Sequence, residues 1–303
     1  MQPGLPATGA ADRDDDFCLR QLPNGEFSMQ SRRERETFHP VIGARREAEL
    51  LYLEQFSLAE RCASTAGGPL VVWDVGLGAA GNAMHLIECW RQHPGRDLQL
   101  ASFDLRDAAL RFALRHHADN AALFPWLRDW DWPRMLREKD CRLTVQGRVL
   151  RWTWHLEDFP DLIRRQAGRA TRGEPPLTVP AIVFYDAYSP ARCWRMWQLA
   201  HWRNLRQVCG DHCELAFHSR ATALRVTLLL AGFYVGYGRA IGNKEETTVA
   251  ATRLELLSRP LNQDWLRQVK RSTSASPFTG TAYTQQPIGE TDYQRLLAHP
   301  QFF

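Results

Sequence analysis

The sequence predicts an α/β fold, with a Rossmann-like, mostly parallel seven-stranded sheet and a terminal antiparallel hairpin. Two observations lead to this fold class. Between residues 67 and 233, short apolar runs alternate with segments of helical periodicity, as strands and helices do in a parallel sheet. The last two apolar runs are joined only by "IGNKEE", and so short a connection requires the two strands to run antiparallel.

Each expected element follows from its own local pattern. The expected strands are runs of apolar, β-branched and aromatic residues bounded by turn or charged residues. They span residues 69–76, 98–104, 148–158, 180–188, 213–219, 234–240 and 247–257. The expected helices carry apolar residues at helical spacing and span residues 45–61, 82–93, 108–117, 159–167, 193–208 and 221–233. A further short strand is expected over 24–29.

The two ends of the chain differ in composition from the rest. We expect residues 1–23, which are polar and carry an acidic run, to be a disordered leader. Residues 24–258 form the expected domain, with a strand and helix extension over 24–66 and the Rossmann-like core over 67–258. Residues 259–303 are polar and irregular, and we expect them to be a tail laid over the domain.

Composition sets broad limits on location and partners. The formal net charge is +4 and the pI is about 8.7, which only weakly suggests an anionic partner. No window approaches the ~20 consecutive apolar residues of a membrane span, so we expect no membrane association. The seven cysteines, an odd number, fit reduced thiols in a cytoplasmic protein. The "CGDHC" run has poor spacing for zinc, and we expect no metal site.

Acidic residues end four consecutive strands of the expected parallel sheet. They are Asp74, Asp104, Asp158 and Asp186. Ligands of open parallel sheets bind beyond the carboxyl ends of the strands. Any one of these acids could instead cap the helix that follows it, but four in register favour a ligand site.

The loop after the first strand contains Gly76 and Gly78, which let the backbone turn tightly and let a ligand approach it. By itself this loop is a weak signal. A carboxylate at the end of the second strand suits a ribose diol, in NAD or in S-adenosylmethionine (SAM) alike. The terminal hairpin favours SAM, because class I SAM-dependent methyltransferases have this hairpin and plain dinucleotide-binding folds do not.

The segment "YDAYSP" also favours SAM, since it places the Asp186 carboxylate at the mouth of the cofactor cleft, where it could bind or deprotonate an amine. Orientation of the amine is the larger expected role, because a carboxylate with a pKa near 4 is a poor base for an alkylammonium. Tyr188 is expected in the pocket wall, with simple core packing as the alternative.

Several motifs between residues 24 and 256 occur together in one known family. An acid-V-G-x-G-x-G-x-N loop reads "DVGLGAAGN" at Asp74–Asn82, and a D-A-F-S-P signature reads "DAYSP" at Asp186–Pro190. Further matches are "HPVIGARREA" at His39–Ala48, the pair Trp132 and Pro133, and "GNKEETTVA" at Gly242–Ala250. With these motifs the chain resembles the methyltransferase domain of MnmC, and especially its stand-alone relatives that lack an oxidase domain.

The resemblance implies a SAM-dependent N-methyltransferase that converts the 5-aminomethyl group of the wobble uridine in tRNA to 5-methylaminomethyl. It implies catalytic roles for Asp186 and Tyr188. It also implies that SAM contacts Glu47, Asp74, Gly76, Gly78, Asn82, Asp104, Asp158 and Asp186. Candidates for contact with tRNA phosphates are Arg32, Arg33, Arg35, Arg45, Arg46, Arg192, Arg195 and Lys244, with solvated surface charge as the alternative.

Three positions depart from the family pattern. Ala80 replaces the third loop glycine, Glu245 replaces a commonly basic residue, and Glu157 stands where the family often has glycine. Two alternatives therefore stay open: methylation of another RNA or a small amine, and a degenerate module that only binds the cofactor. A nicotinamide oxidoreductase is a further alternative, which a sheet without the terminal hairpin would indicate.

Overall fold

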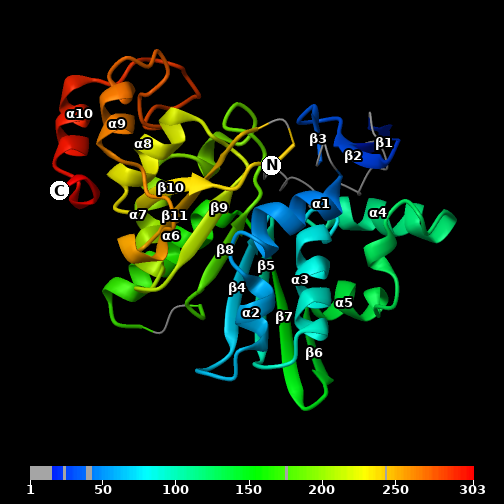
Figure 1. Ribbon diagram of the computed structural model, residues 1–303. Helices are drawn as coiled ribbons and strands as arrows, with labels where there is room; N and C mark the ends of the chain where they lie inside the picture. The colour runs from blue at the N-terminus through cyan, green and yellow to red at the C-terminus, as the bar shows by residue number, and fades with distance from the viewer. Residues whose placement is uncertain (1–15, 23–24, 39–42, 175–176, 243) are drawn as a thin grey trace, which may run out of the picture.

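A computed structural model describes residues 16–22, 25–38, 43–174, 177–242 and 244–303. The main sheet has the order β10-β11-β9-β8-β4-β5-β7-β6 (Figure 1). Its strands are β4 (Leu70–Val75), β5 (Leu98–Asp104), β6 (Asp140–Val145), β7 (Arg148–Leu156), β8 (Ile182–Tyr185), β9 (Glu214–Phe217), β10 (Tyr234–Gly238) and β11 (Thr247–Ala251). Strand β4 pairs in parallel with β5 and β8, and β11 runs antiparallel to both β9 and β10. The expected parallel sheet with a terminal hairpin is confirmed.

The sheet has an eighth strand that the sequence reading missed. Strand β6 pairs antiparallel with β7 at the opposite edge from the terminal hairpin. Only Gln146 and Gly147 connect the two strands, with φ of 51° and 78°. Positive φ at both positions of a two-residue loop is the turn that matches the twist of a hairpin. The Gln-Gly pair was therefore the overlooked signal, and the number of strands is corrected from seven to eight.

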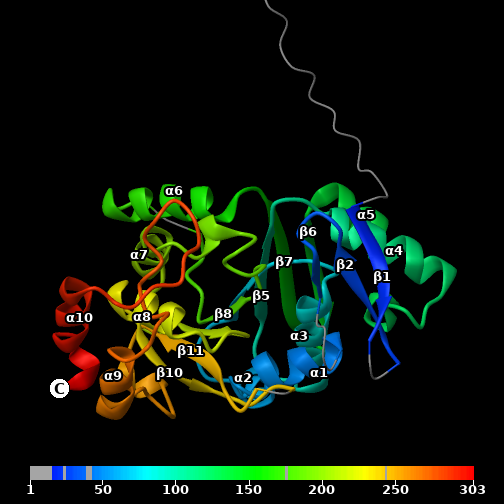
Figure 2. The same cartoon turned by 90° about the horizontal axis from the view of Figure 1, so that it is seen from above.

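Helices cover both faces of the main sheet. They are α1 (Ala44–Ala48), η2 (Glu49–Leu53), α2 (Leu58–Ala63), α3 (Gly81–Gln92), α4 (Ala108–Asp119), η3 (Pro125–Leu127), α5 (Trp132–Glu138), α6 (Phe159–Thr171), η4 (Trp194–Met196), α7 (Leu199–Val208), α8 (Thr222–Leu230), η5 (Leu254–Leu256), α9 (Gln263–Val269), α10 (Glu290–Leu297) and η6 (Pro300–Phe302). Figure 2 shows α3 on one side of the sheet and α6 and α7 on the other.

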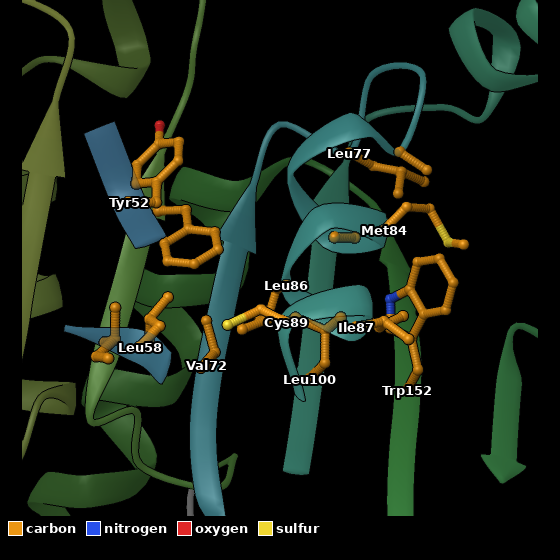
Figure 3. Packing of buried hydrophobic residues seen from close by; sticks show 14 of the residues in the cluster. Tyr52, Leu58, Val72, Leu77, Met84, Leu86, Ile87, Cys89, Leu100 and Trp152 are labelled. Atoms are coloured by element: carbon orange, nitrogen blue, oxygen red, sulfur yellow. The ribbon is translucent and has the colours of Figure 1, made fainter. Parts of the chain in front are cut away.

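Alternation along the strands creates two hydrophobic cores. In β4, Val72 belongs to the core beside α3, whereas Trp73 and Val75 belong to the core beside α6 and α7. Figure 3 shows Val72, Leu86 and other apolar side chains filling the space between β4 and α3. Successive strand residues point to opposite faces, so a strand that is covered on both faces must be apolar throughout. The residues of β4 that precede Asp74 follow this rule.

The expected helix over residues 45–61 is broken, which corrects the sequence prediction. A π-helical turn, η2, follows α1, and α2 starts only after Ser57, whose φ of 48° lies in the left-handed region. The helical spacing of the leucines does not reveal such a break. Tyr52, which lies in η2, stacks on Phe184 of β8, with ring centroids 4.3 Å apart.

A small second sheet precedes the core. Strand β1 (Phe17–Gln21) pairs antiparallel with β2 (Phe27–Ser31), which pairs with β3 (Glu36–Thr37). The expected leader over residues 1–23 is therefore too long, because it includes β1; residues 1–15 lie outside the described residues. The expected strand over 24–29 corresponds to β2, shifted toward the C-terminus.

Residues 259–303 are part of the fold, which corrects the expected irregular tail. They contain α9 and α10, and Leu261, Trp265, Phe278 and Leu296 belong to the core beside α6 and α7. Apolar residues spaced this widely among polar ones do not give a periodic signal in the sequence. Figures 1 and 2 place α9 and α10 at the end of the molecule opposite to β1–β3.

Replacing Trp265 by alanine tests whether this C-terminal segment belongs to the cooperative fold. Trp265 is 6% exposed and stacks on Phe302. The truncation should lower the free energy of unfolding in urea by about 3–5 kcal/mol, because it leaves a cavity in the core. Gln268→Ala, an exposed position on the same helix, should change that free energy by less than about 0.5 kcal/mol. Equal stability of the two variants would show that the segment is an appendage.

Candidate active site

The site begins where β4 ends and the chain turns into α3. Gly76 has a φ of 102°, a conformation that favours glycine. A Cβ at this position would overlap the carbonyl oxygen of Asp186, just after β8. Two backbone hydrogen bonds hold this contact: Gly76 N–H donates to Phe103 O at 2.9 Å, and Asp186 N–H donates to Val75 O at 2.8 Å. The glycine loop and the "DAYSP" segment therefore meet directly.

Ala80 occupies the place of the third loop glycine and keeps the conformation of a glycine. Its φ of 60° and ψ of 18° are left-handed, and its side chain is fully buried. For an L-residue this conformation costs about 1–2 kcal/mol. The loop still leads into α3, since Met84 N–H donates to Ala80 O at 2.9 Å. Ala80 therefore carries backbone strain, and the loop passes through it into α3.

Asn82 connects helix α3 to Asp186. The asparagine is 6% exposed, and its Nδ2 donates to Asp186 Oδ2 at 2.9 Å. This bond fixes one oxygen of the half-buried carboxylate. Asn82 Oδ1 is buried and has no hydrogen-bond partner among the described residues. Two oxygen acceptors, one charged and one neutral, therefore lie beside the glycine loop.

Asp74 lies beneath the loop in a fully buried polar network. Trp152 Nε1 donates to Ser102 Oγ, and Ser102 Oγ donates to Asp74 Oδ2, both at 2.9 Å. Asp74 Oδ1 has no hydrogen-bond partner in the described part of the chain. Burial raises the pKa of Asp74 to about 8, with further contributions from the charges of Asp186 and Asp104, although the Ser102 bond opposes the shift. Near neutral pH this carboxyl group therefore holds its proton in the folded protein.

Asp104, at the end of β5, accepts hydrogen bonds from the glycine loop. Gly78 N–H donates to Asp104 Oδ2 at 3.1 Å, and Leu105 N–H donates to Oδ1 at 2.7 Å. Burial raises the pKa of Asp104, and the backbone N–H donors act in the opposite direction. The acid expected to bind the ribose thus borders the loop expected to bind the methionine part of SAM.

Asp158 differs from the other strand-end acids because its carboxylate caps a helix and pairs with an arginine. Asp158 Oδ1 caps α6 by accepting from Asp161 N–H at 3.0 Å, and Oδ2 accepts from Arg195 Nη1 at 2.9 Å. This is the helix-capping role that the sequence left open for each acid. A contact between Asp158 and adenine stays a prediction.

Tyr188 faces the small N-terminal sheet. Its ring meets Phe38 at 5.7 Å in an edge contact, and Ser31 of β2 interacts with its hydroxyl. Burial raises the pKa of the Tyr188 hydroxyl. Phe38 also lies against Gly78, and Glu36 accepts hydrogen bonds from the backbone N–H and hydroxyl of Ser189. The N-terminal sheet therefore covers part of the site, with Tyr188 at the junction.

Glu47 lies on α1 and is 4% exposed, so it is not a solvated helix residue. His218 Nε2, just after β9, is 3.7 Å from Glu47 Oε1. Lys244, from the connection between β10 and β11, donates to His218 Nδ1 at 3.1 Å and to His218 O at 2.7 Å. Burial lowers the pKa of Lys244. These contacts hold Lys244 against His218, which argues against the expected role of Lys244 in phosphate contact.

The structure thus brings together most of the residues expected to bind SAM: Asp74, Gly76, Gly78, Asn82, Asp104 and Asp186. The sequence reading missed Tyr52 and His218. The signal for His218 was its place at the carboxyl end of the fifth expected strand. Tyr52 is hidden in the apolar pattern of a helix, and nothing in that pattern marks it. Residues 39–42 of the "HPVIGARREA" motif and Asn243 of "GNKEETTVA" lie outside the described residues.

A surface hollow of about 420 Å³ lies elsewhere, beside α1, η2 and α3, and is lined in part by Glu49, Glu60 and Glu88. None of the residues expected to bind SAM lines it, so it has no part in the site. In the described ranges, no three histidine, cysteine or acidic side chains come together as a metal site. Of the described helices, none has the length and apolar character needed to cross a bilayer.

The chain is similar to known methyltransferases in sequence. Residues 176–253 match the model of a family described as S-adenosyl-L-methionine-dependent methyltransferase. Over 227 residues, the chain is 25% identical to the tRNA 5-methylaminomethyl-2-thiouridine biosynthesis bifunctional protein MnmC of Methylibium petroleiphilum. That match covers 71% of this chain and 31% of the relative, so the chain spans about a third of the relative's length.

The structure of MnmC2 from Aquifex aeolicus matches with a TM-score of 0.63 and 20% identity, over 93% of this chain and 84% of that one. These matches support a SAM-dependent methyltransferase domain similar to that of MnmC. Its cofactor is SAM, and the class I fold expected from the sequence is confirmed. A SAM-dependent methyltransferase from Agrobacterium tumefaciens is more distant, with 12% identity, a TM-score of 0.40 and coverage of 78% of this chain and 71% of that one.

Gly76→Ala should disrupt this MnmC-like site, because the added methyl would overlap the Asp186 carbonyl in a backbone conformation that L-residues rarely adopt. We expect the free energy of unfolding to fall by about 2–5 kcal/mol and SAM binding, measured by calorimetry, to be lost. Gly68→Ala is the matched control, since a Cβ there meets nothing within 4 Å. Normal SAM affinity in Gly76→Ala would refute the assigned contact.

The raised pKa of Asp74 predicts that stability falls as pH rises. Between its ordinary value of 3.8 and the folded value of about 8, the folded protein holds a proton that the unfolded chain has lost. The stabilisation is complete below about pH 4 and is lost at about 1.4 kcal/mol per pH unit up to about pH 8. Asp74→Asn keeps an acceptor for Ser102 without titrating, so its unfolding free energy should decline less over this range. Identical pH profiles of both proteins in urea titrations would contradict the shift.

Proposed function

We propose that this protein transfers the methyl group of SAM to the primary amine of 5-aminomethyluridine at the wobble position of tRNA, giving 5-methylaminomethyluridine. The name of the Methylibium petroleiphilum relative places that protein in the biosynthesis of a 5-methylaminomethyl-2-thiouridine in tRNA. The motif "DAYSP" and the glycine loop support the same chemistry here, because they lie in contact. We also propose a cytoplasmic location, where tRNA is modified.

One observation carries this proposal: the bond between Asn82 Nδ2 and Asp186 Oδ2 at 2.9 Å. It fixes a half-buried carboxylate beside the loop that follows β4. SAM supplies an electrophilic methyl carbon on a sulfonium, and an amine can attack it only through a free lone pair. Asp186 accepts an N–H of the amine and so orients the lone pair toward that carbon.

The cofactor residues fit SAM in their donor and acceptor chemistry. Gly76 and Gly78 allow the methionine part to pass close to the backbone. Asp104 accepts from the ribose hydroxyls, and Asp158 contacts the adenine end. The buried Asn82 Oδ1, without a partner among the described residues, marks a place where a ligand N–H completes the hydrogen bonding, and the protonated Asp74 Oδ1 can donate to a ligand oxygen. Glu47, buried on α1, adds negative charge that suits the cationic cofactor.

In this proposal Tyr188 shapes the pocket wall and also anchors the N-terminal sheet. Its ring packs on Phe38 and its hydroxyl interacts with Ser31, so its contacts are with the N-terminal sheet. We therefore assign Tyr188 to exclusion of water and to the position of the sheet that covers the loop.

In this proposal, exposed arginines near the site contact the tRNA. Arg192 lies two residues after the "DAYSP" segment and is exposed, and Arg32 and Arg35 are exposed in the turn between β2 and β3. Other candidates pair with acids, as Arg195 does with Asp158 and Arg46 with Glu49. The remaining arginines neutralise tRNA phosphates, so the affinity for tRNA falls as the salt concentration rises.

Asp186→Asn is the sharpest test of the proposed chemistry, because the amide keeps the shape of the carboxylate and loses its charge. Methylation of tRNA from a strain lacking the modification, followed by nucleoside mass spectrometry, should fall at least about 100-fold. SAM affinity, measured by calorimetry, should fall far less than activity, because the other residues expected to bind SAM are intact. Asp211→Asn, at an exposed position before β9, should behave as the wild type in both measurements.

The outcomes separate the alternatives. Full activity of Asp186→Asn would refute the role of this residue. A wild-type protein that binds SAM and leaves this tRNA unmodified would indicate another RNA or a small amine as the substrate. A wild-type protein that fails to bind SAM would indicate a degenerate module.

A further inference from the structure

Tyr52 is a buried side chain that neither the fold nor the mechanism above explains. It is 1% exposed, and its ring stacks on Phe184 of β8 at a centroid distance of 4.3 Å. Figure 3 shows its hydroxyl pointing toward the end of the sheet where β4 ends. That hydroxyl has no hydrogen-bond partner in the described part of the chain and is closed off from solvent. The stacked ring therefore holds a polar atom in one place without any partner to satisfy it.

Three carboxyl groups of the site act electrostatically on this hydroxyl. Burial raises its pKa well above the ordinary value, and the negative charges of Asp186, Glu47 and Asp74 raise it further, with Asp186 contributing most of the three. The hydroxyl is therefore neutral throughout the physiological range. It can donate its proton to a carboxylate and accept an N–H with its lone pairs. A cationic or N–H-bearing ligand suits such surroundings.

The buried Tyr52 hydroxyl lowers the stability of the folded protein. A buried hydroxyl without a partner costs about 1–3 kcal/mol, and phenylalanine would fill the same space without that cost. Tyr185 shows the usual arrangement on the opposite face of the sheet, since its buried hydroxyl donates to Met196 O at 2.6 Å. The Tyr52 hydroxyl is buried, has no hydrogen-bond partner among the described residues and feels the charge of Asp186, which points to a ligand as its partner.

We propose that the Tyr52 hydroxyl binds the acceptor amine together with Asp186 and thereby limits the reaction to one methyl group per amine. This inference rests on the proposed function, because the amine is the group that Asp186 is assigned to hold. A neutral primary amine has two N–H bonds and one lone pair. With one N–H donated to Asp186 and the other to Tyr52, the lone pair has a single direction left, toward the methyl carbon.

The same two acceptors discriminate against a second transfer. In the first transfer the nitrogen lone pair forms the N–C bond while the S–C bond breaks and its electrons stay on sulfur. The dialkylammonium product then loses one proton to water. The resulting secondary amine has only one N–H, so in the reacting orientation it leaves either Asp186 or Tyr52 without a partner. Sites that bind a substrate N–H reject analogues that lack it.

Tyr52→Phe tests this inference with Tyr185→Phe as the matched control. Tyr52→Phe should lower kcat roughly tenfold with tRNA carrying 5-aminomethyluridine, since one orienting bond is lost. It should also raise the fraction of 5-dimethylaminomethyluridine detected by nucleoside mass spectrometry. Its Tm should stay equal or rise, because an unsatisfied hydroxyl is removed. Tyr185→Phe should lower the Tm and leave the ratio of mono- to dimethylated product unchanged.

A binding measurement keeps this inference separate from the proposed function. The nucleoside 5-aminomethyluridine is titrated into wild type and Tyr52→Phe, each saturated with S-adenosylhomocysteine, and weaker binding by the variant supports the inference. Equal affinity in both, or no binding to either, overturns it. Unchanged kcat and product ratio in a folded Tyr52→Phe also overturn it. Failure of the wild type to methylate the tRNA, with the nucleoside still bound through Tyr52, overturns only the choice of tRNA as substrate.

Discussion

The close approach of the Gly76 backbone to the Asp186 carbonyl is the constraint on which the site depends. Pairing of β4 with β8 sets the distance between the two segments, and a left-handed turn at Gly76 lets them meet. Asn82 then joins the side chain of Asp186 to the first turn of α3. A loop expected to bind the cofactor and a carboxylate expected to bind the amine are thereby held in one rigid unit, as in-line methyl transfer requires.

Around this unit the protein keeps polar atoms that its own fold leaves without partners. Oxygen atoms of Tyr52, Asp74 and Asn82 are buried without hydrogen bonds among the described residues. Such atoms reduce stability, and natural proteins retain them where a ligand completes the bonding. The raised pKa of Asp74 has the same origin, since burial among other acids disfavours its charged form. Stability and binding therefore make opposing demands on this end of the sheet.

Segments outside the Rossmann-like core complete the molecule at its two ends. The N-terminal sheet reaches the site through Phe38 against Gly78 and Glu36 against Ser189. The C-terminal segment covers the opposite end, where Trp265 and Phe278 enter the core beside α6 and α7. The N-terminal sheet affects access to the site. The C-terminal segment stabilises the sheet that supports the site.

The sequence by itself determined the parallel sheet, its terminal hairpin and the acids at the strand ends, because periodicity and loop length are local properties of the chain. It also indicated Asp186 and the glycine loop through motifs. Only the tertiary structure decided that Asp158 caps a helix, that Lys244 lies against His218, and that residues 259–303 belong to the core. The role suggested for Tyr52 likewise depends on its stacking against Phe184 from a distant strand. These features come from contacts between residues far apart in the chain, and no local pattern encodes such contacts.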